Sequence, residues 1–107
     1  MSKDSITAAE LLKLINERAV TIVHIMSRRA FIEYRIKGSI WIPYNEIEDH
    51  VFTQIDRNRT IVTYCKDESC MSSDIAAKIL RESGFNALAY RGGVKEWRAL
   101  GYPSESG

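Results

Sequence analysis

Two spacings of apolar residues run through the chain, and each predicts one kind of secondary structure. Nearly continuous apolar runs with β-branched and aromatic residues are typical of strands covered on both faces. Apolar residues repeated every three or four positions are typical of amphipathic helices. We expect about five strands, among them residues 20–26, 39–42, 61–64 and 85–90, and helices at residues 8–17, 28–35, 46–54, 74–83 and 94–100.

The order of these elements predicts the fold class. Strands and helices alternate from end to end, which indicates an α/β fold with a central parallel sheet and helices on both faces. The length of 107 residues fits a single domain. We expect residues 1–5 and 104–107 to be frayed, because chain ends are poorly ordered unless other segments hold them.

Local signals support individual elements. Thr7-Ala8-Ala9-Glu10 has the form of a capping box, with a side-chain acceptor followed three residues later by glutamate. Ser72 and Ser73 are expected to cap the helix that follows them. Gly92-Gly93 indicates a tight backbone position that a larger residue would not fit.

Composition excludes several classes of protein. The net charge of +1 provides no basic surface for nucleic acid or for an anionic membrane. No apolar run approaches the roughly 18 residues of a membrane-spanning helix, and the polar start Met1-Ser2-Lys3-Asp4 is unlike a signal peptide. We therefore expect a cytoplasmic protein whose two cysteines rest as thiols.

The main candidate for chemistry is Cys65, which ends the predicted strand 61–64. A polar loop, residues 66–72, leads from it directly into a helix. Backbone N–H groups in such a loop lack partners and, with the helix dipole, favour negative charge. A thiolate would be stabilised there, so Cys65 is a candidate nucleophile. A cysteine that is simply packed at the end of an apolar strand is the alternative.

A set of short motifs in a fixed order extends this interpretation. They are Ile61-Val62-Thr63-Tyr64-Cys65, Ser73 with Ala76-Ala77 and Leu80, Gly84-Phe85, Arg91-Gly92-Gly93-Val94-Lys95-Glu96-Trp97 and Gly101-Tyr102-Pro103. Weaker matches in the first half are Ala9-Glu10-Leu11, Phe31 and Ile40-Trp41-Ile42-Pro43. In order and spacing the chain resembles a rhodanese domain from about Ile6 to Pro103.

The resemblance implies a sulfurtransferase with Cys65 as its catalytic nucleophile. In such enzymes the thiolate attacks the outer sulfur of a donor such as thiosulfate or a thiol persulfide. The persulfide then passes sulfur to a nucleophile such as cyanide or another thiol, including a thiol of a protein. The resemblance implies neither metal nor cofactor. It implies an anion cradle made by the loop backbone, here that of Lys66, Asp67, Glu68, Ser69, Cys70, Met71 and Ser72.

The chain also departs from the family pattern. His24 and Met26 stand where the family often has Asp-x-Arg, and Ser72 stands where the active loop often has arginine. The loop is about two residues longer than usual, contains no glycine, and carries Asp67 and Glu68. Two negative charges disfavour a dianion, so we expect thiosulfate to be a poorer donor than a thiol persulfide.

Several further residues have two interpretations. Arg28 and Arg91 follow predicted strands, and either could supply the cation that the loop lacks. Cys70 is either a resolving cysteine that protects or discharges Cys65 through a disulfide, or a thiol packed within the loop. Zinc binding by the two cysteines is disfavoured, because the sequence offers no second pair of ligands. Lys66 either stabilises the sulfur anion or is a solvated surface residue.

The histidines and tryptophans are expected to be structural. His24 lies within an apolar run, which favours a packed, hydrogen-bonded side chain over a general base. His50 is expected on the surface of a helix. Trp41 and Trp97 are expected in the core.

Three other functions compete with sulfur transfer. The first is a non-catalytic or regulatory rhodanese-like module that binds a partner, for which the altered loop is the argument. The second is a thiol redox switch that uses Cys65 and Cys70. The third is a phosphatase with a lengthened cysteine loop. It is disfavoured because Met71, and not arginine, is the sixth residue after Cys65.

Overall fold

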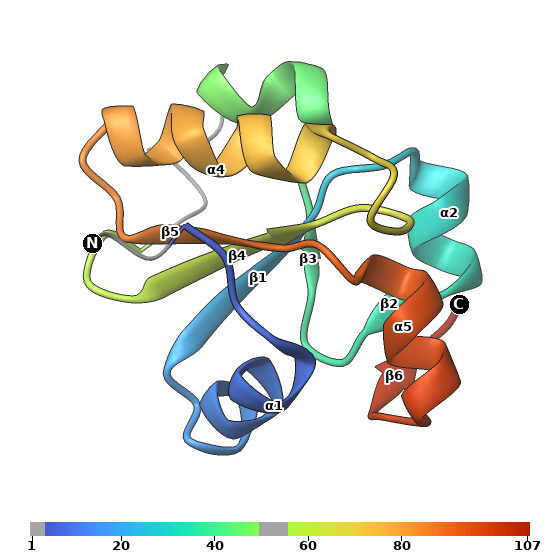
Figure 1. Cartoon of the computed structure of the whole chain (residues 1–107). Coiled ribbons are helices and arrows are strands. Elements are labelled where there is room, and N and C mark those ends of the chain that lie inside the picture. The colour runs from blue at the N-terminus through green and yellow to red at the C-terminus, as the bar shows by residue number, and fades with distance from the viewer. Residues whose placement is uncertain (1–3, 50–55) are drawn as a thin grey trace.

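A computed structural model of the protein describes residues 4–49 and 56–107. Its centre is a parallel sheet of four strands in the order β3-β1-β4-β5 (Figure 1). The strands are β1 (Val20–His24), β3 (Ile40–Trp41), β4 (Thr60–Tyr64) and β5 (Ala87–Tyr90). The prediction of an α/β fold with a central parallel sheet is confirmed, with four strands in this sheet where we expected about five.

Helices cover both faces of the sheet, as the alternating pattern predicts. They are α1 (Ala8–Asn16), α2 (Arg28–Glu33), α4 (Ser72–Glu82) and α5 (Gly93–Leu100), with a short 3-10 helix at Tyr44–Glu46. Helix α4 lies on one face, and α1 and α5 lie on the other (Figure 1). The capping box is present at α1, where Thr7 accepts a hydrogen bond from the Glu10 N–H.

The core consists of two clusters, one on each face of the sheet. The first includes Val23, Ile61, Ala76, Ala77 and Leu80, and the second includes Leu11, Ile22, Val62, Tyr64 and Trp97. Neighbouring residues of one strand belong to different clusters because successive side chains of a strand point to opposite faces. This explains why the strands read as continuous apolar runs in the sequence.

A small antiparallel sheet, which the sequence pattern did not indicate, joins β2 (Arg35–Ile36) to β6 (Ser104–Glu105). Helix α2 therefore ends at Glu33, two residues earlier than predicted. The expectation that residues 104–107 are frayed is wrong, because this segment pairs with β2. Two-residue strands carry too little periodicity to be seen in a sequence, and their partners lie about 70 positions away.

The beginning of the chain is also held, from Asp4 onward. Ser5 bridges Ala89 in parallel, and the Ile6 N–H donates to the Ala89 carbonyl oxygen at 3.0 Å. Residues 4 and 5 were expected to be frayed and instead extend the edge of the sheet beside β5. Backbone hydrogen bonds to that open edge give the segment its order.

The predicted helix 46–54 can be followed only in part. Residues 47–49 are helical and Ile47 is buried, whereas the remainder, including His50, lies outside the described residues. None of the helices in the described ranges has the length and apolarity that a membrane crossing requires.

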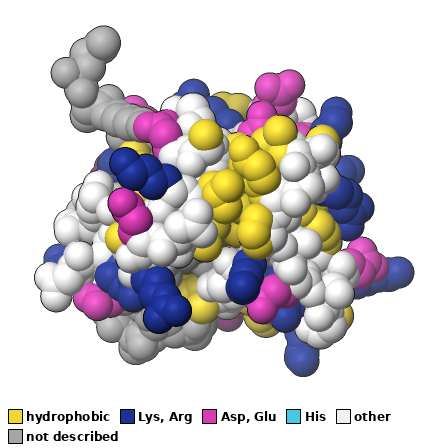
Figure 2. Space-filling model, turned by 90° about the horizontal axis from the view of Figure 1, so that it is seen from below, with side chains coloured by type: hydrophobic (Ala, Val, Ile, Leu, Met, Phe, Trp, Pro, Cys, Tyr) yellow, Lys and Arg dark blue, Asp and Glu magenta, His cyan; other side chains and the backbone are white. Residues whose placement is uncertain are grey.

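The outer surface on the side of α1 and α5 carries charges of both signs. Figure 2 shows this face, with Lys and Arg side chains interspersed with Asp and Glu, and with hydrophobic side chains gathered in a central band. Nearby, a groove between the start of α1 and α5 is lined by residues that include Ile6, Ala8, Leu100 and Tyr102. The scattered charges agree with the near-neutral net charge of the chain.

Candidate active site

Cys65 lies directly after β4, at the edge of the sheet where the carboxyl ends of the parallel strands meet. Its side chain is buried, at 7% exposure, and packs in the cluster beneath α4. Residues 66–71 then lead to Ser72, the first residue of α4. The predicted order of strand, cysteine, loop and helix is therefore confirmed.

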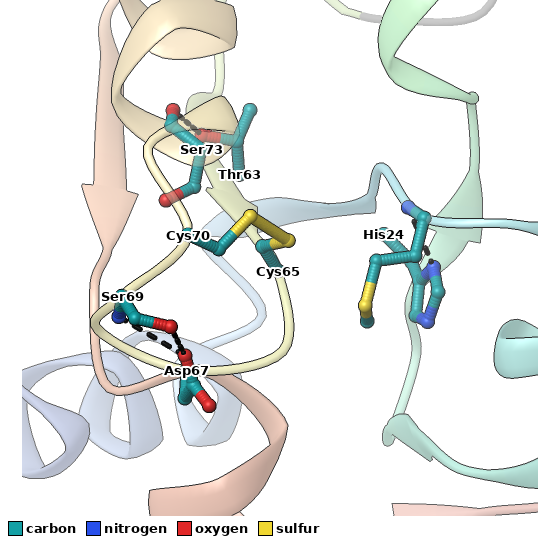
Figure 3. The surroundings of a disulfide bond; sticks show 8 residues. His24, Thr63, Cys65, Asp67, Ser69, Cys70 and Ser73 are labelled. Carbon is teal, nitrogen blue, oxygen red and sulfur yellow. Dashed lines mark hydrogen bonds between the residues drawn. A yellow bond between two sulfur atoms is a disulfide. The ribbon is translucent and has the colours of Figure 1, made fainter.

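A disulfide joins Cys65 to Cys70 within this loop (Figure 3). The two Cα atoms are 6.4 Å apart, within the usual range for a disulfide. The expectation that both cysteines rest as thiols is wrong for this structure, and so is the interpretation of Cys70 as a thiol packed within the loop. The alternative, a pair that forms a disulfide, is what the structure contains.

Asp67 makes the turn that brings the two cysteines together. Its side chain accepts hydrogen bonds from the N–H and the hydroxyl of Ser69 (Figure 3). Its carbonyl oxygen accepts a hydrogen bond from the Cys70 N–H at 3.1 Å. The hydrogen bonds from Ser69 hold the pKa of the Asp67 carboxyl below its ordinary value. Asp67 therefore keeps its negative charge at the centre of the loop.

The same turn reduces the number of backbone N–H groups that the predicted anion cradle can offer to a ligand. Two of the seven expected N–H donors, those of Ser69 and Cys70, already bond to Asp67 and are not available to a ligand. The other five make no hydrogen bond within the described residues; they belong to Lys66, Asp67, Glu68, Met71 and Ser72. An anion bound at this loop would meet N–H donors at the two ends of the loop and the Asp67 carboxylate at its centre.

The loop meets α4 without a side-chain cap, contrary to expectation. Met71 is the N-cap residue, and Ser72 and Ser73 are already helical. Ser73 is buried, and its carbonyl oxygen accepts a hydrogen bond from the Thr63 hydroxyl at 2.7 Å. This contact ties the first turn of α4 to β4, the strand that ends next to Cys65 (Figure 3).

The start of α5 holds the start of the loop, a role that the sequence suggested only through its two glycines. The N–H groups of Val94 and Lys95 donate to the carbonyl oxygens of Cys65 and Lys66, at 3.1 and 2.9 Å. Gly93 has φ of +62°, and a Cβ atom there would lie 2.6 Å from the Cys65 carbonyl oxygen. Glycine is thus required for this close approach.

His24, at the position where the family often has aspartate, is fully buried. Its Nδ1 accepts a hydrogen bond from the Met26 N–H at 3.3 Å, and its ring meets the rings of Phe31 and Tyr64 edge to face. Burial lowers the pKa of His24 to about 4, so the imidazole is neutral at pH 7. Nε2 has no partner among the described residues. The prediction of a packed, hydrogen-bonded histidine is confirmed.

The arginines proposed to replace the missing loop cation are differently placed. Arg91 pairs with Asp74 in the first turn of α4, with Nε and Oδ1 2.9 Å apart. Arg28 is exposed at the first residue of α2. Neither arginine lines the cavity that lies between the loop and α5 and is described below. Lys66 lines a smaller cavity of about 200 Å³ with Met26 and Arg98.

A cavity of about 470 Å³ lies between the loop and α5. It is lined by Asp67, Glu68, Ser69, Gly92, Lys95, Glu96 and Ala99. Three of these are carboxylates and one is a lysine, so the cavity disfavours a doubly negative ligand. Lys95 and Glu96 were missed as lining residues because they face the loop only once α5 has docked on it. Neither here nor elsewhere in the described ranges do three His, Cys, Asp or Glu side chains gather as a metal site would need.

Comparison with known proteins gives a consistent result. A family model described as "Rhodanese-like domain" matches residues 7–100. The HTH-type transcriptional regulator Rv0324 of Mycobacterium tuberculosis is 32% identical over 105 residues, which cover 98% of this chain and 46% of that protein. The chain therefore spans about half the length of this curated relative.

Solved structures share the same fold. A protein from Bacillus halodurans has a TM-score of 0.89 at 24% identity, with 97% of this chain and 77% of that chain covered. A rhodanese-related protein from Thermoplasma volcanium has a TM-score of 0.83 at 27% identity, with 95% and 97% covered. The arrangement of strand, cysteine loop and helix therefore sits in a fold that several bacterial and archaeal proteins share.

Proposed function

Because the chain belongs to the family of rhodanese-like domains, we propose that it transfers sulfane sulfur through a persulfide on Cys65. The reduced Cys65 thiolate attacks the outer sulfur of a donor R–S–SH. The bond between the donor's two sulfur atoms breaks, R–S⁻ leaves, and Cys65 becomes a persulfide. A nucleophile then takes the outer sulfur and returns the Cys65 thiolate.

The observation that carries this proposal is the position of the Cys65 sulfur. It lies at the carboxyl end of β4, next to the first turn of α4, and it already bears a second sulfur atom, that of Cys70. In a persulfide the transferred sulfur would take the place that the Cys70 sulfur occupies in the disulfide. Free N–H groups at both ends of the loop support negative charge on that outer atom.

We propose that the donor is a thiol persulfide and not thiosulfate. The loop has Ser72 where an arginine would pair with a sulfonate, and its centre carries the Asp67 carboxylate. The adjacent cavity adds Glu68 and Glu96. Like charges disfavour binding of a dianion such as thiosulfate, whereas the R–S–SH form of a thiol persulfide carries no charge on its two sulfur atoms.

Intact-mass spectrometry tests the proposal. The Cys70→Ser variant, which cannot form the internal disulfide, is incubated with glutathione persulfide and, separately, with thiosulfate. We expect it to gain the mass of one sulfur atom, faster from the persulfide, and to lose this mass to cyanide as thiocyanate. The matched control, Cys65→Ser, should gain none. An unmodified Cys70→Ser protein with both donors would count against the proposed function.

The match to a transcriptional regulator favours a second candidate, a sensing module in which the state of Cys65 is read by another part of a longer protein. The disulfide is compatible with this function, because it converts the site between two chemical states. Absence of sulfur uptake from both donors, together with reversible disulfide formation, would favour the sensing module over the transferase.

A further inference from the structure

We infer that Cys70 discharges the Cys65 persulfide, so that the domain releases sulfide and is reset by a dithiol reductant. This inference rests on the proposed function, because it needs sulfur on Cys65 in the first place. It makes Cys70 a second catalytic residue, and it replaces the external sulfur acceptor with a thiol of the same loop.

The loop is folded so that Cys70 returns to Cys65. Five residues in extended conformation span about 17 Å, whereas the two Cα atoms are 6.4 Å apart. The turn is maintained by hydrogen bonds from the Ser69 and Cys70 N–H groups to Asp67. Because neither bond involves sulfur, reduction of the disulfide removes neither, and we expect the turn to keep the two cysteines close in the reduced protein.

Position favours Cys70 over an external acceptor. Its sulfur is bonded to that of Cys65 in the structure, whereas an external acceptor must first diffuse to the loop. Cys70 is half-buried and packs against the core cluster that includes Cys65. A nucleophile held in place reacts as if its concentration were far above that of any free thiol.

The step balances in atoms and electrons. The Cys70 thiol attacks the inner sulfur of the persulfide, which is the Sγ atom of Cys65. A disulfide bond forms between Cys65 and Cys70, the bond to the outer sulfur breaks, and hydrosulfide leaves with that electron pair. The Cys70 proton converts the hydrosulfide to hydrogen sulfide. The sulfane sulfur is reduced to sulfide, and the two cysteines are oxidised by two electrons.

The product of this step is the disulfide that the structure contains. A further turnover needs a dithiol, which reduces the disulfide by exchange and becomes a disulfide itself. The reaction that precedes this domain must therefore supply a persulfide, and the reaction that follows must supply reducing equivalents from a dithiol.

A sulfide-release assay tests the inference. The protein is reduced, freed of reductant and mixed with excess glutathione persulfide. For the wild type we expect a burst of one equivalent of sulfide, conversion to the disulfide form, and further release only when dithiothreitol is added. For Cys70→Ser we expect a stable persulfide and sulfide release slower by on the order of a hundred-fold. Cys65→Ser and donor without protein give the background.

The two proposals fail in different ways. If Cys70→Ser takes up sulfur but the reduced wild type keeps its persulfide as long as the variant does, the role of Cys70 is wrong and the transferase stands. If Cys70→Ser takes up no sulfur, the proposed function itself is wrong. Circular dichroism of the Cys70→Ser variant and of a second variant, Cys70→Ala, checks that each has folded.

Discussion

His24 sets the electrostatic character of the strand end beside Cys65. A buried imidazole between two aromatic rings replaces the acidic residue that the family often has at this position. Its Nδ1 is fixed as a hydrogen-bond acceptor by the Met26 N–H. The neutral ring therefore adds no charge to the site at pH 7, whose charged residues come from the loop and from the start of α5.

The lowered pKa of His24 predicts how stability depends on pH. Its value is about 4 in the folded protein against 6.5 ordinarily, so the unfolded chain binds more protons between these values. Stability should therefore decrease as the pH falls from 6.5 to 4, by at most about 3 kcal/mol from this residue. Chemical denaturation across this range measures how steeply the free energy of unfolding changes with pH. The His24→Gln variant should show a shallower dependence.

An NMR titration checks the same residue directly. The imidazole of His24 should keep its chemical shifts from pH 8 to pH 5, because its pKa of about 4 lies below this range. Two imidazoles that both titrate near pH 6.5 would contradict the buried neutral state of His24.

At the residue scale the sequence predicted Cys65 but not its bonding partner. An apolar strand that ends in cysteine and leads into a helix identifies the candidate site, because ligands in parallel sheets bind at the carboxyl ends of the strands. The disulfide depends on the turn at Asp67, and a spacing of five residues is compatible with either a bonded or a separate pair. The exposure and pairing of Arg91 likewise depend on tertiary structure.

At the scale of elements, the docking of α5 on the cysteine loop is the contact that positions the candidate site. Two backbone N–H groups of α5 bond to the first two carbonyl oxygens of the loop, across Gly93. Helix α4 is tied to β4 by the Thr63 hydroxyl. The loop is therefore held between the first turns of two helices, which lie on opposite faces of the sheet.

Gly93→Ala should disrupt this docking. Alanine would combine a positive φ, at a cost of about 1–2 kcal/mol, with a clash against the Cys65 carbonyl oxygen that adds about 1–3 kcal/mol. We expect a loss of about 3 kcal/mol in the free energy of unfolding and slower sulfur uptake, measured by urea denaturation and mass spectrometry.

Gly101→Ala is the matched control for Gly93→Ala. Gly101 has a similar φ of +68°, but nothing lies within 4 Å of a Cβ atom at that position. Only the conformational cost of about 1–2 kcal/mol should appear, with normal sulfur uptake. Equal effects of the two substitutions would show that the contact at Gly93 is unimportant.

The sequence predicted long elements better than short ones. Strands β1 and β4 and helices α1, α4 and α5 have enough residues for an apolar period to show. Strands β2 and β6 have two residues each, and they are held by backbone hydrogen bonds between segments remote in sequence. These two strands form only because they pair in the folded protein, and the pattern of apolar residues near each of them does not indicate this pairing.

At the scale of the whole molecule, the disulfide stabilises the fold as well as defining the state of the site. In the chain-entropy account, closing a loop of six residues contributes about 2 kcal/mol. Reduction should therefore lower the melting temperature by up to about 10 °C in a domain of this size. Differential scanning calorimetry with and without dithiothreitol measures the change.

Cys70→Ser provides the control for the effect of reduction. Its melting temperature should be the same with and without dithiothreitol and close to that of the reduced wild type. A wild-type protein that shows two free thiols after reduction, yet melts at an unchanged temperature, would contradict the stabilising role of the disulfide.

The attachment of α5 to residues 65 and 66 consists of peptide groups alone. Side chains at positions 67 to 72 can therefore change without removing the two hydrogen bonds that fix the backbone at Cys65. Under the proposed function, the choice of sulfur donor could then be engineered through these six residues while the scaffold stays as it is.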